Sequence, residues 1–215
     1  MSSMLSRRAI RLVPASRFPF VPQYAHQALP GADRVCRVAE PVLEQLLQAQ
    51  RHLRAASTSA RRFDLLIWDA YRAHDTQRWL FDDYTDRLMR EEGLEHQAAA
   101  EAATRYVSHP ASVYPHGTGG AVDLTLLVDD EEAVMGTSFD AFEENAAADW
   151  YDRHPPRTPM DRLASANRER LCDAMRSGGF VPHPDEWWHY EWGTMRWAAE
   201  TGCGVVLDTT VEADG

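Results

Sequence analysis

Two segments carry the apolar patterns typical of β-strands. Within residues 121–128, apolar side chains recur at every second position, on a face formed by Val122, Leu124, Leu126 and Val128. Asp123 and Thr125 fall on the opposite face, so the Asp123 carboxylate points away from the core. Phe63–Trp68 is a short and nearly continuous apolar run, which predicts a central strand.

Helical spacing of apolar residues appears in longer segments. Val35–Ala56 predicts a helix of about five turns, and Pro41 suits its first turn. Three further helices are predicted at Thr76–Gly93, Glu95–Val107 and Arg162–Ser177. Because these helices accompany strands that must pair out of chain order, the fold class is α+β, with helices packed on a small, mainly antiparallel sheet.

The length of 215 residues fits one domain with a sizeable core. We therefore expect a single domain over residues 1–215. Residues 1–32 are expected to form an irregular N-terminal arm, because prolines and aromatic residues cluster there without a clear period. Residues 205–215 are expected to form a tail with one short edge strand and a frayed end.

Charge and cysteine usage restrict the partners and the compartment. The chain has 22 basic and 33 acidic residues, a formal net charge of −11 that repels nucleic acid and anionic membranes. Its three cysteines are scattered without paired spacing, so they predict neither a disulfide framework nor a thiolate metal site. We expect a cytoplasmic protein, without an export signal or a membrane-spanning segment.

The stretch 184–192, Pro-Asp-Glu-Trp-Trp-His-Tyr-Glu-Trp, concentrates aromatic and acidic residues. Its alternation predicts a strand that places Trp187, His189 and Glu191 on one face. Glu186 reaches the same point as His189 only if the chain bends or bulges near Trp187, with Glu186 still in the entering loop. An isolated histidine in such a stretch is more often a buried or rim residue than a ligand, so a second cluster must decide its role.

That second cluster begins at His116 and continues into the strand of Asp123. The pair Gly119-Gly120 permits a tight reversal, which would fold His116 back beside Asp123. His116, Asp123 and His189 would then supply two imidazoles and one carboxylate, the ligand count of a catalytic zinc site with a fourth position for water. Glu186, three residues before His189, would be an unligated carboxylate that takes the proton of that water.

These residues resemble those of a known family, the zinc D-alanyl-D-alanine dipeptidases of the VanX type. The resemblance covers the chain from about residue 63 to residue 192. It rests on Trp68-Asp69-Ala70-Tyr71-Arg72, the pair His116 and Asp123 with glycines between them, the segment from Met135 to Asp140, and Glu186-Trp187-Trp188-His189-Tyr190. These segments occur in the order that the family has.

The resemblance implies a role for each site residue and the fold of the family. It implies one zinc ion per chain in the cleft, bound by His116, Asp123 and His189. It also implies that Glu186 is the catalytic base and that Arg72 stabilises the transition state. Asp140 would pair with the free amino group of the substrate.

The sequence also departs from the family pattern. Tyr114 stands where the family commonly has a serine that contacts substrate, so the resemblance leaves the exact dipeptide open. Ala73 replaces the family's proline after the motif arginine. The family has an N-terminal tyrosine that helps to close the pocket, and the residue here that fits this role is Tyr24.

Three functions compete at this point. The first is hydrolysis of a small dipeptide, D-alanyl-D-alanine or a similar D,D-dipeptide, within cell-wall metabolism. The second is a zinc carboxypeptidase or endopeptidase that acts on peptidoglycan stem peptides, and this reading ordinarily needs export. The third is a zinc-binding module without catalysis, against which Glu186 and Arg72 argue. The oligomeric state and the physiological role stay open.

Overall fold

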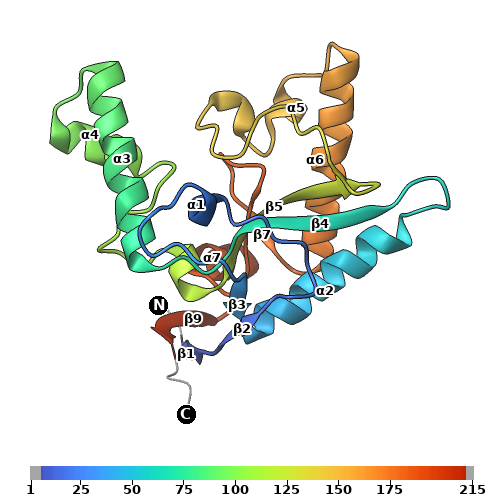
Figure 1. Ribbon diagram of the computed structural model, residues 1–215, viewed down its shortest axis with the longest axis horizontal. Helices are drawn as coiled ribbons and strands as arrows, with labels where there is room; N and C mark the ends of the chain where they lie inside the picture. The colour runs from blue at the N-terminus through green and yellow to red at the C-terminus, as the bar shows by residue number, and fades with distance from the viewer. Residues whose placement is uncertain (1–5, 212–215) are drawn as a thin grey trace.

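A five-stranded sheet lies at the centre of the protein (Figure 1). The computed structural model describes the backbone of residues 6–211 and the side chains of residues 6–208. The strand order is β4-β5-β8-β7, β6 also pairs with β5, and all these pairs are antiparallel. The strands are β4 (Phe63–Asp69), β5 (Ala121–Val128), β6 (Glu131–Glu132), β7 (Val181–Pro182) and β8 (His189–Glu191). Together with the helices, this sheet confirms the α+β fold class.

The alternation predicted for β5 is confirmed. Val122, Leu124 and Leu126 are fully buried in the main apolar core. Two long helices, α2 (Glu40–Ala55) and α6 (Pro159–Ser177), pack against each other and contribute their apolar faces to this core. A second apolar cluster lies between α3 (His74–Glu92) and α4 (His96–Ala103), which form a separate pair at the left of Figure 1, away from α2 and α6.

The strand β4 corrects one prediction, because it lies at the end of the strand order rather than in the centre. All seven of its residues are nevertheless buried. The outer backbone edge of β4 is covered by the N-terminal segment: the Ile67 amide donates to the Pro19 carbonyl, and the Val21 amide donates to the Ile67 carbonyl. The apolar run of β4 therefore reflects burial by an irregular segment, which sequence periodicity does not distinguish from burial by a second strand.

The N-terminal region is also more regular than the irregular arm predicted for residues 1–32. It contains β1 (Ser6–Ile10), β2 (Leu12–Pro14) and the short helix α1 (Gln23–His26). Strand β1 pairs in parallel with β9 (Val205–Val211), and β2 pairs antiparallel with β3 (Arg37–Ala39). These strands escaped the sequence analysis because β1 is largely exposed and lacks an apolar face. The edge strand predicted near the C-terminus corresponds to β9, and residues 1–5 and 212–215 lie outside the described part.

Several predicted boundaries shift for local reasons. The tryptophan-rich strand is confined to β8, because Trp187 and Trp188 lie in a turn that the His189 amide closes on the Glu186 carbonyl, 3.3 Å away. Helix α6 begins at Pro159, earlier than predicted, because Thr158 and Asp161 form a reciprocal capping box before it. Helix α4 ends at Ala103, before the predicted Val107. The remaining elements are η1 (Pro115–Thr118), η2 (Glu144–Ala146), α5 (Trp150–Arg153) and α7 (Met195–Thr201).

None of the helices within residues 6–211 is both long enough and apolar enough to cross a membrane.

The turn between η1 and β5 yields a stability prediction. Gly119 has φ of 64°, and a Cβ there would lie 2.8 Å from the Ala39 backbone nitrogen. Gly93 has φ of 68° with nothing within 4 Å of the point that a Cβ would occupy, so Gly93→Ala isolates the cost of the backbone conformation. We expect Gly93→Ala to lower the free energy of unfolding by about 1 kcal/mol. Gly119→Ala should lower the free energy of unfolding by roughly 1–3 kcal/mol more, because the Ala39 backbone amide is held by a hydrogen bond and cannot move aside. Urea unfolding of both variants measures the difference, and equal losses would contradict the clash.

Candidate active site

The register of the sheet aligns three polar residues in one row. Asp69 on β4 pairs with Asp123 on β5, and Asp123 pairs with His189 on β8. Side chains at directly paired positions project to the same face of a sheet, so the three groups lie side by side. The next pair, Val122 with Tyr190, projects into the apolar core instead. The sheet therefore separates a polar face near the row from the core behind it.

His116 reaches this row from η1, the 3-10 turn that precedes β5. Its Nδ1 donates to the Ala70 carbonyl over 2.7 Å, which fixes the ring and leaves Nε2 directed at the sheet. The turn closes because Gly119 adopts a left-handed conformation between His116 and β5. This is the reversal that the paired glycines predict.

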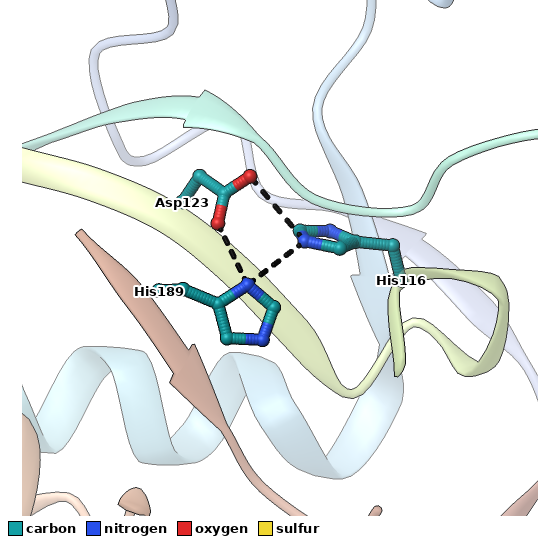
Figure 2. A group of neighbouring side chains, drawn as sticks. All are labelled: His116, Asp123 and His189. Carbon is teal, nitrogen blue, oxygen red and sulfur yellow. Dashed lines mark hydrogen bonds and ion pairs between the residues drawn. The ribbon is translucent and has the colours of Figure 1, made fainter. Parts of the chain in front are cut away.

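The structure brings His116, Asp123 and His189 together, as Figure 2 shows. The Asp123 carboxylate lies 3.0 Å from His189 Nδ1 through Oδ1 and 3.3 Å from His116 Nε2 through Oδ2. The two imidazole nitrogens are 3.2 Å apart. All three side chains are buried, and one ligand atom from each lies within 4.8 Å of the others. Among the described residues, this group could hold a metal ion.

The chemistry of this cluster fits a cation. Burial alone would raise the pKa of Asp123, but the two imidazoles hold it well below its usual range. Burial lowers the pKa of His189, and hydrogen bonds with Asp123 and Glu191 outweigh this and raise it to about 10. Both shifts show that positive charge is favoured between these side chains. On the side away from Asp123, His189 Nε2 lies 3.3 Å from Glu191 Oε1. With the Ala70 carbonyl beside His116, each imidazole has an outer partner that orients it.

Glu186 lies beside the cluster without belonging to it. Its Oε2 is 3.8 Å from His189 Nδ1, and its side chain is buried. Burial raises the pKa of Glu186 to about 8, with His189 acting against the shift and Asp123 adding to it. The turn that carries Glu186 is held by the Trp187 amide, which donates to the Ala146 carbonyl over 2.9 Å.

Arg72 approaches from the end of β4. Its Nε donates to Asp69 over 2.8 Å, Nη1 donates to Gln77 over 3.0 Å, and Nη2 lies 3.3 Å from Asp123 Oδ2. Burial works against its charge, but Tyr24, Asp69 and Asp123 outweigh this and raise the pKa of Arg72 above its usual range. The guanidinium is therefore charged and fixed beside the histidine and aspartate cluster.

Asp140 faces the same space from a long loop. It is half-buried, and its Oδ2 accepts a hydrogen bond from the Tyr24 hydroxyl over 3.0 Å. Burial, with a smaller contribution from Asp123, raises the pKa of Asp140 to about 7, while Arg72 opposes the shift. The guanidinium carbon of Arg72 also lies over the Tyr24 ring, 5.0 Å from the ring centroid.

Tyr114 is buried at the entrance of η1. Its hydroxyl donates to the Arg72 carbonyl over 3.1 Å, and its ring packs against Gly117, where a Cβ would lie 2.6 Å away. Tyr114 thereby ties the histidine turn to the segment that carries Arg72.

All the site residues named in the sequence analysis line one pocket of about 230 Å³. This volume is below the roughly 300–1,000 Å³ of sites for drug-sized ligands, so the pocket suits a small substrate. The lining includes Tyr24, Arg72, Tyr114, His116, Asp123, Asp140, Glu186 and His189.

The sequence analysis gave no role to two supporting residues, Gln77 and Glu191. Strand alternation places Glu191 on the same face as His189, but it does not show that the Glu191 carboxylate contacts the His189 imidazole. Gln77 accepts from Arg72 and donates to the Ser108 carbonyl over 2.6 Å, and nothing in the sequence pattern distinguishes it from other polar residues of α3.

Comparison with known proteins adds independent findings. The sequence model of the family described as D-ala-D-ala dipeptidase matches residues 24–203. A D-alanyl-D-alanine dipeptidase of Synechocystis sp. is 30% identical over 174 residues, which cover 73% of this chain and 69% of that protein. A D-alanyl-D-alanine dipeptidase of Enterococcus faecalis is 32% identical over 152 residues, 68% of each chain. One from Escherichia coli is 32% identical over 128 residues, 59% of this chain and 54% of its own.

Proposed function

The chain belongs to the D-ala-D-ala dipeptidase family, and we propose that it hydrolyses D-alanyl-D-alanine or a similar D,D-dipeptide with the help of one zinc ion. One observation carries the proposal. A buried carboxylate, Glu186, stands beside three converging ligand atoms in a small pocket, and this is the arrangement that metal-assisted peptide hydrolysis requires.

We assign His116, Asp123 and His189 as the zinc ligands. Two imidazole nitrogens and one carboxylate are the donors that a catalytic zinc site uses, with one position left for water. The Ala70 carbonyl and Glu191 support this assignment, because each holds the outer nitrogen of one ligand imidazole. When bound, zinc supplies Lewis acidity, which makes water a better nucleophile and the peptide carbonyl a better electrophile.

Glu186 is the proposed general base. It takes a proton from the attacking water as the new C–O bond forms, and it delivers a proton to the leaving amine nitrogen as the C–N bond breaks. Its raised pKa of about 8 suits delivery of a proton to the amine, and a cation bound by the neighbouring ligands would lower that pKa and favour the ionised base. Arg72 donates hydrogen bonds to the oxygen on which negative charge develops, and Asp69 and Gln77 hold the guanidinium for that task.

Asp140 is the proposed partner of the substrate's free ammonium group. Its carboxylate lacks a cation partner strong enough to keep its pKa in the usual range, so an ammonium group would offset its burial. Tyr24 orients this carboxylate through its hydroxyl. A longer peptide places a neutral amide and further chain at this point, which favours free dipeptides over stem peptides. Tyr114 is proposed to limit the cleft near Arg72.

The remaining expectations belong to the same proposal. A single peptidase domain over residues 1–215 agrees with the family match to residues 24–203. A cytoplasmic location is supported by the three cysteines, all of which are free.

The first prediction concerns the metal. The protein should bind one zinc ion, and His116→Ala and His189→Ala should each lose it, because neither leaves a complete ligand set. Elemental analysis after dialysis measures the stoichiometry. His96→Ala, which removes an exposed histidine at the start of α4, is the matched control and should keep full occupancy. Full zinc content in both ligand variants would overturn the assignment.

The second prediction separates chemistry from metal binding. Glu186→Gln should keep zinc and fold but lower kcat by orders of magnitude, because a neutral amide accepts no proton. Arg72→Ala should raise the barrier by about 3 kcal/mol, the effect of removing one oxyanion donor. Asp185→Asn, one position before the base, is the control and should leave kcat near normal. Near-normal turnover by Glu186→Gln would mean that another group is the base.

The third prediction concerns the free amino group. The protein should hydrolyse D-alanyl-D-alanine and act little on its N-acetylated form or on a stem pentapeptide. Asp140→Asn should lower kcat/KM for the free dipeptide by about 10- to 100-fold, the effect of one charged hydrogen bond, and narrow its advantage over the acetylated form. Glu143→Gln, exposed on the same loop, is the control. Rapid release of terminal D-alanine from the pentapeptide would instead favour a carboxypeptidase.

A further inference from the structure

The loop that carries Asp140, residues 134–147, has little regular structure of its own. Its one regular element is η2, and Asp140 itself has φ of 55°, a left-handed conformation that costs energy for a residue with a Cβ. In Figure 1 the end of this loop lies close to α6. The position of the Asp140 carboxylate therefore depends on contacts from outside the loop.

Arg168 on α6 supplies the main outside contacts. Its Nε donates to the Met135 carbonyl over 2.7 Å, and its Nη1 donates to the carbonyls of Asn145 and Ala147 over 2.9 and 3.1 Å. One guanidinium thus joins the two ends of the Asp140 loop. The preceding residue, Asn167, adds a bond from Nδ2 to the Val134 carbonyl over 2.9 Å.

This environment is unfavourable for a charged side chain. Arg168 is 5% exposed, and within the described residues its polar contacts are backbone carbonyls, with one nitrogen, Nη2, left without a hydrogen-bond partner. Burial lowers the pKa of Arg168 to about 10. A buried cation without a carboxylate partner is unfavourable by several kcal/mol unless dipoles and ring faces surround it. The carbonyls and the rings of Tyr151 and Trp187, 5.0 and 5.5 Å from the guanidinium carbon, provide that environment.

Trp187 connects the same cluster to the catalytic side of the pocket. It follows Glu186 directly, and its indole Nε1 donates to Thr137 over 2.7 Å. Its backbone amide donates to the Ala146 carbonyl, near the other end of the Asp140 loop. The loop is consequently held at both ends by Arg168 and at two further points by the residue beside Glu186.

We propose that Arg168 is a positioning residue for substrate recognition, which holds the Asp140 loop closed so that the Asp140 carboxylate meets the substrate's free ammonium group. The inference rests on the proposed role of Asp140. Arg168 acts through the loop, because it is absent from the described residues that line the pocket. An arginine is required, since only its planar fork presents donors in the separate directions of the carbonyls.

Arg168→Lys tests this with charge preserved and the fork removed. We expect KM for free D-alanyl-D-alanine to rise about 10- to 100-fold, because the loop no longer places Asp140 accurately. The zinc content and kcat should stay close to normal, and the preference for the free over the N-acetylated dipeptide should fall. Arg162→Lys, exposed on the same helix, is the matched control and should change none of these quantities. Thr137→Val, which removes only the Trp187 bond to the loop, should shift KM in the same direction by less.

The decisive measurement is a double-mutant cycle with Asp140→Asn. If Arg168 acts through Asp140, adding Arg168→Lys to Asp140→Asn should change the preference little further. Independent, multiplicative effects of the two substitutions would overturn the inference. It would also be overturned if Asp140→Asn lost the preference for the free dipeptide while Arg168→Lys kept it. Either result would leave the proposed function standing. A joint fall in kcat, zinc content and unfolding free energy would show a merely structural role. An unchanged preference in Asp140→Asn would overturn the proposed role of Asp140 and with it the role of Arg168.

Discussion

The register of β5 between its two neighbours is the constraint on which the pocket depends. It sets Asp69, Asp123 and His189 in one row on one face of the sheet, while Val122 and Tyr190 fill the core behind it. Because side chains alternate along a strand, a slip by one residue would bury the polar row in the core and expose the apolar one. The stability of the core therefore also fixes the geometry of the proposed zinc ligands.

The pocket gathers several carboxyl groups in a largely buried site. Asp69, Asp123 and Asp140 lie around Arg72, and Glu186 lies beside His189. Burial raises the pKa of Asp140 and of Glu186. Carboxylates crowded in this way gain when cations arrive, which is the electrostatic preference of a site for a metal ion and an ammonium group. Arg72 contacts several partners at once, namely Asp69, Gln77 and Asp123. These contacts fix its guanidinium where it stabilises more than one carboxylate.

Aromatic packing transmits this order to the parts of the pocket that lie outside the sheet. The ring of Phe139, next to Asp140, contacts the rings of Trp68 and Trp188 at centroid distances of 5.0 and 5.8 Å. Trp187 packs on Trp68 at 5.8 Å, so the turn of Glu186 and the loop of Asp140 share one rigid aromatic layer. Trp187 and Trp188 of the stretch 184–192 therefore support the residues around them through packing.

The sequence by itself determined the pattern of β5, the α+β class and the family. Strand alternation places Asp123 opposite the core wherever β5 is found, and the bend before His189 follows from the need to bring Glu186 to the same point. The edge position of β4, the pairing of β1 with β9, and the contacts of Gln77 and Arg168 were decided by the tertiary structure alone. Periodicity reports whether a side chain is buried, but it does not report which distant segment buries it. The partners of Arg168 lie more than 20 residues away along the chain, so only the folded backbone could bring the carbonyls of Met135, Asn145 and Ala147 to one guanidinium.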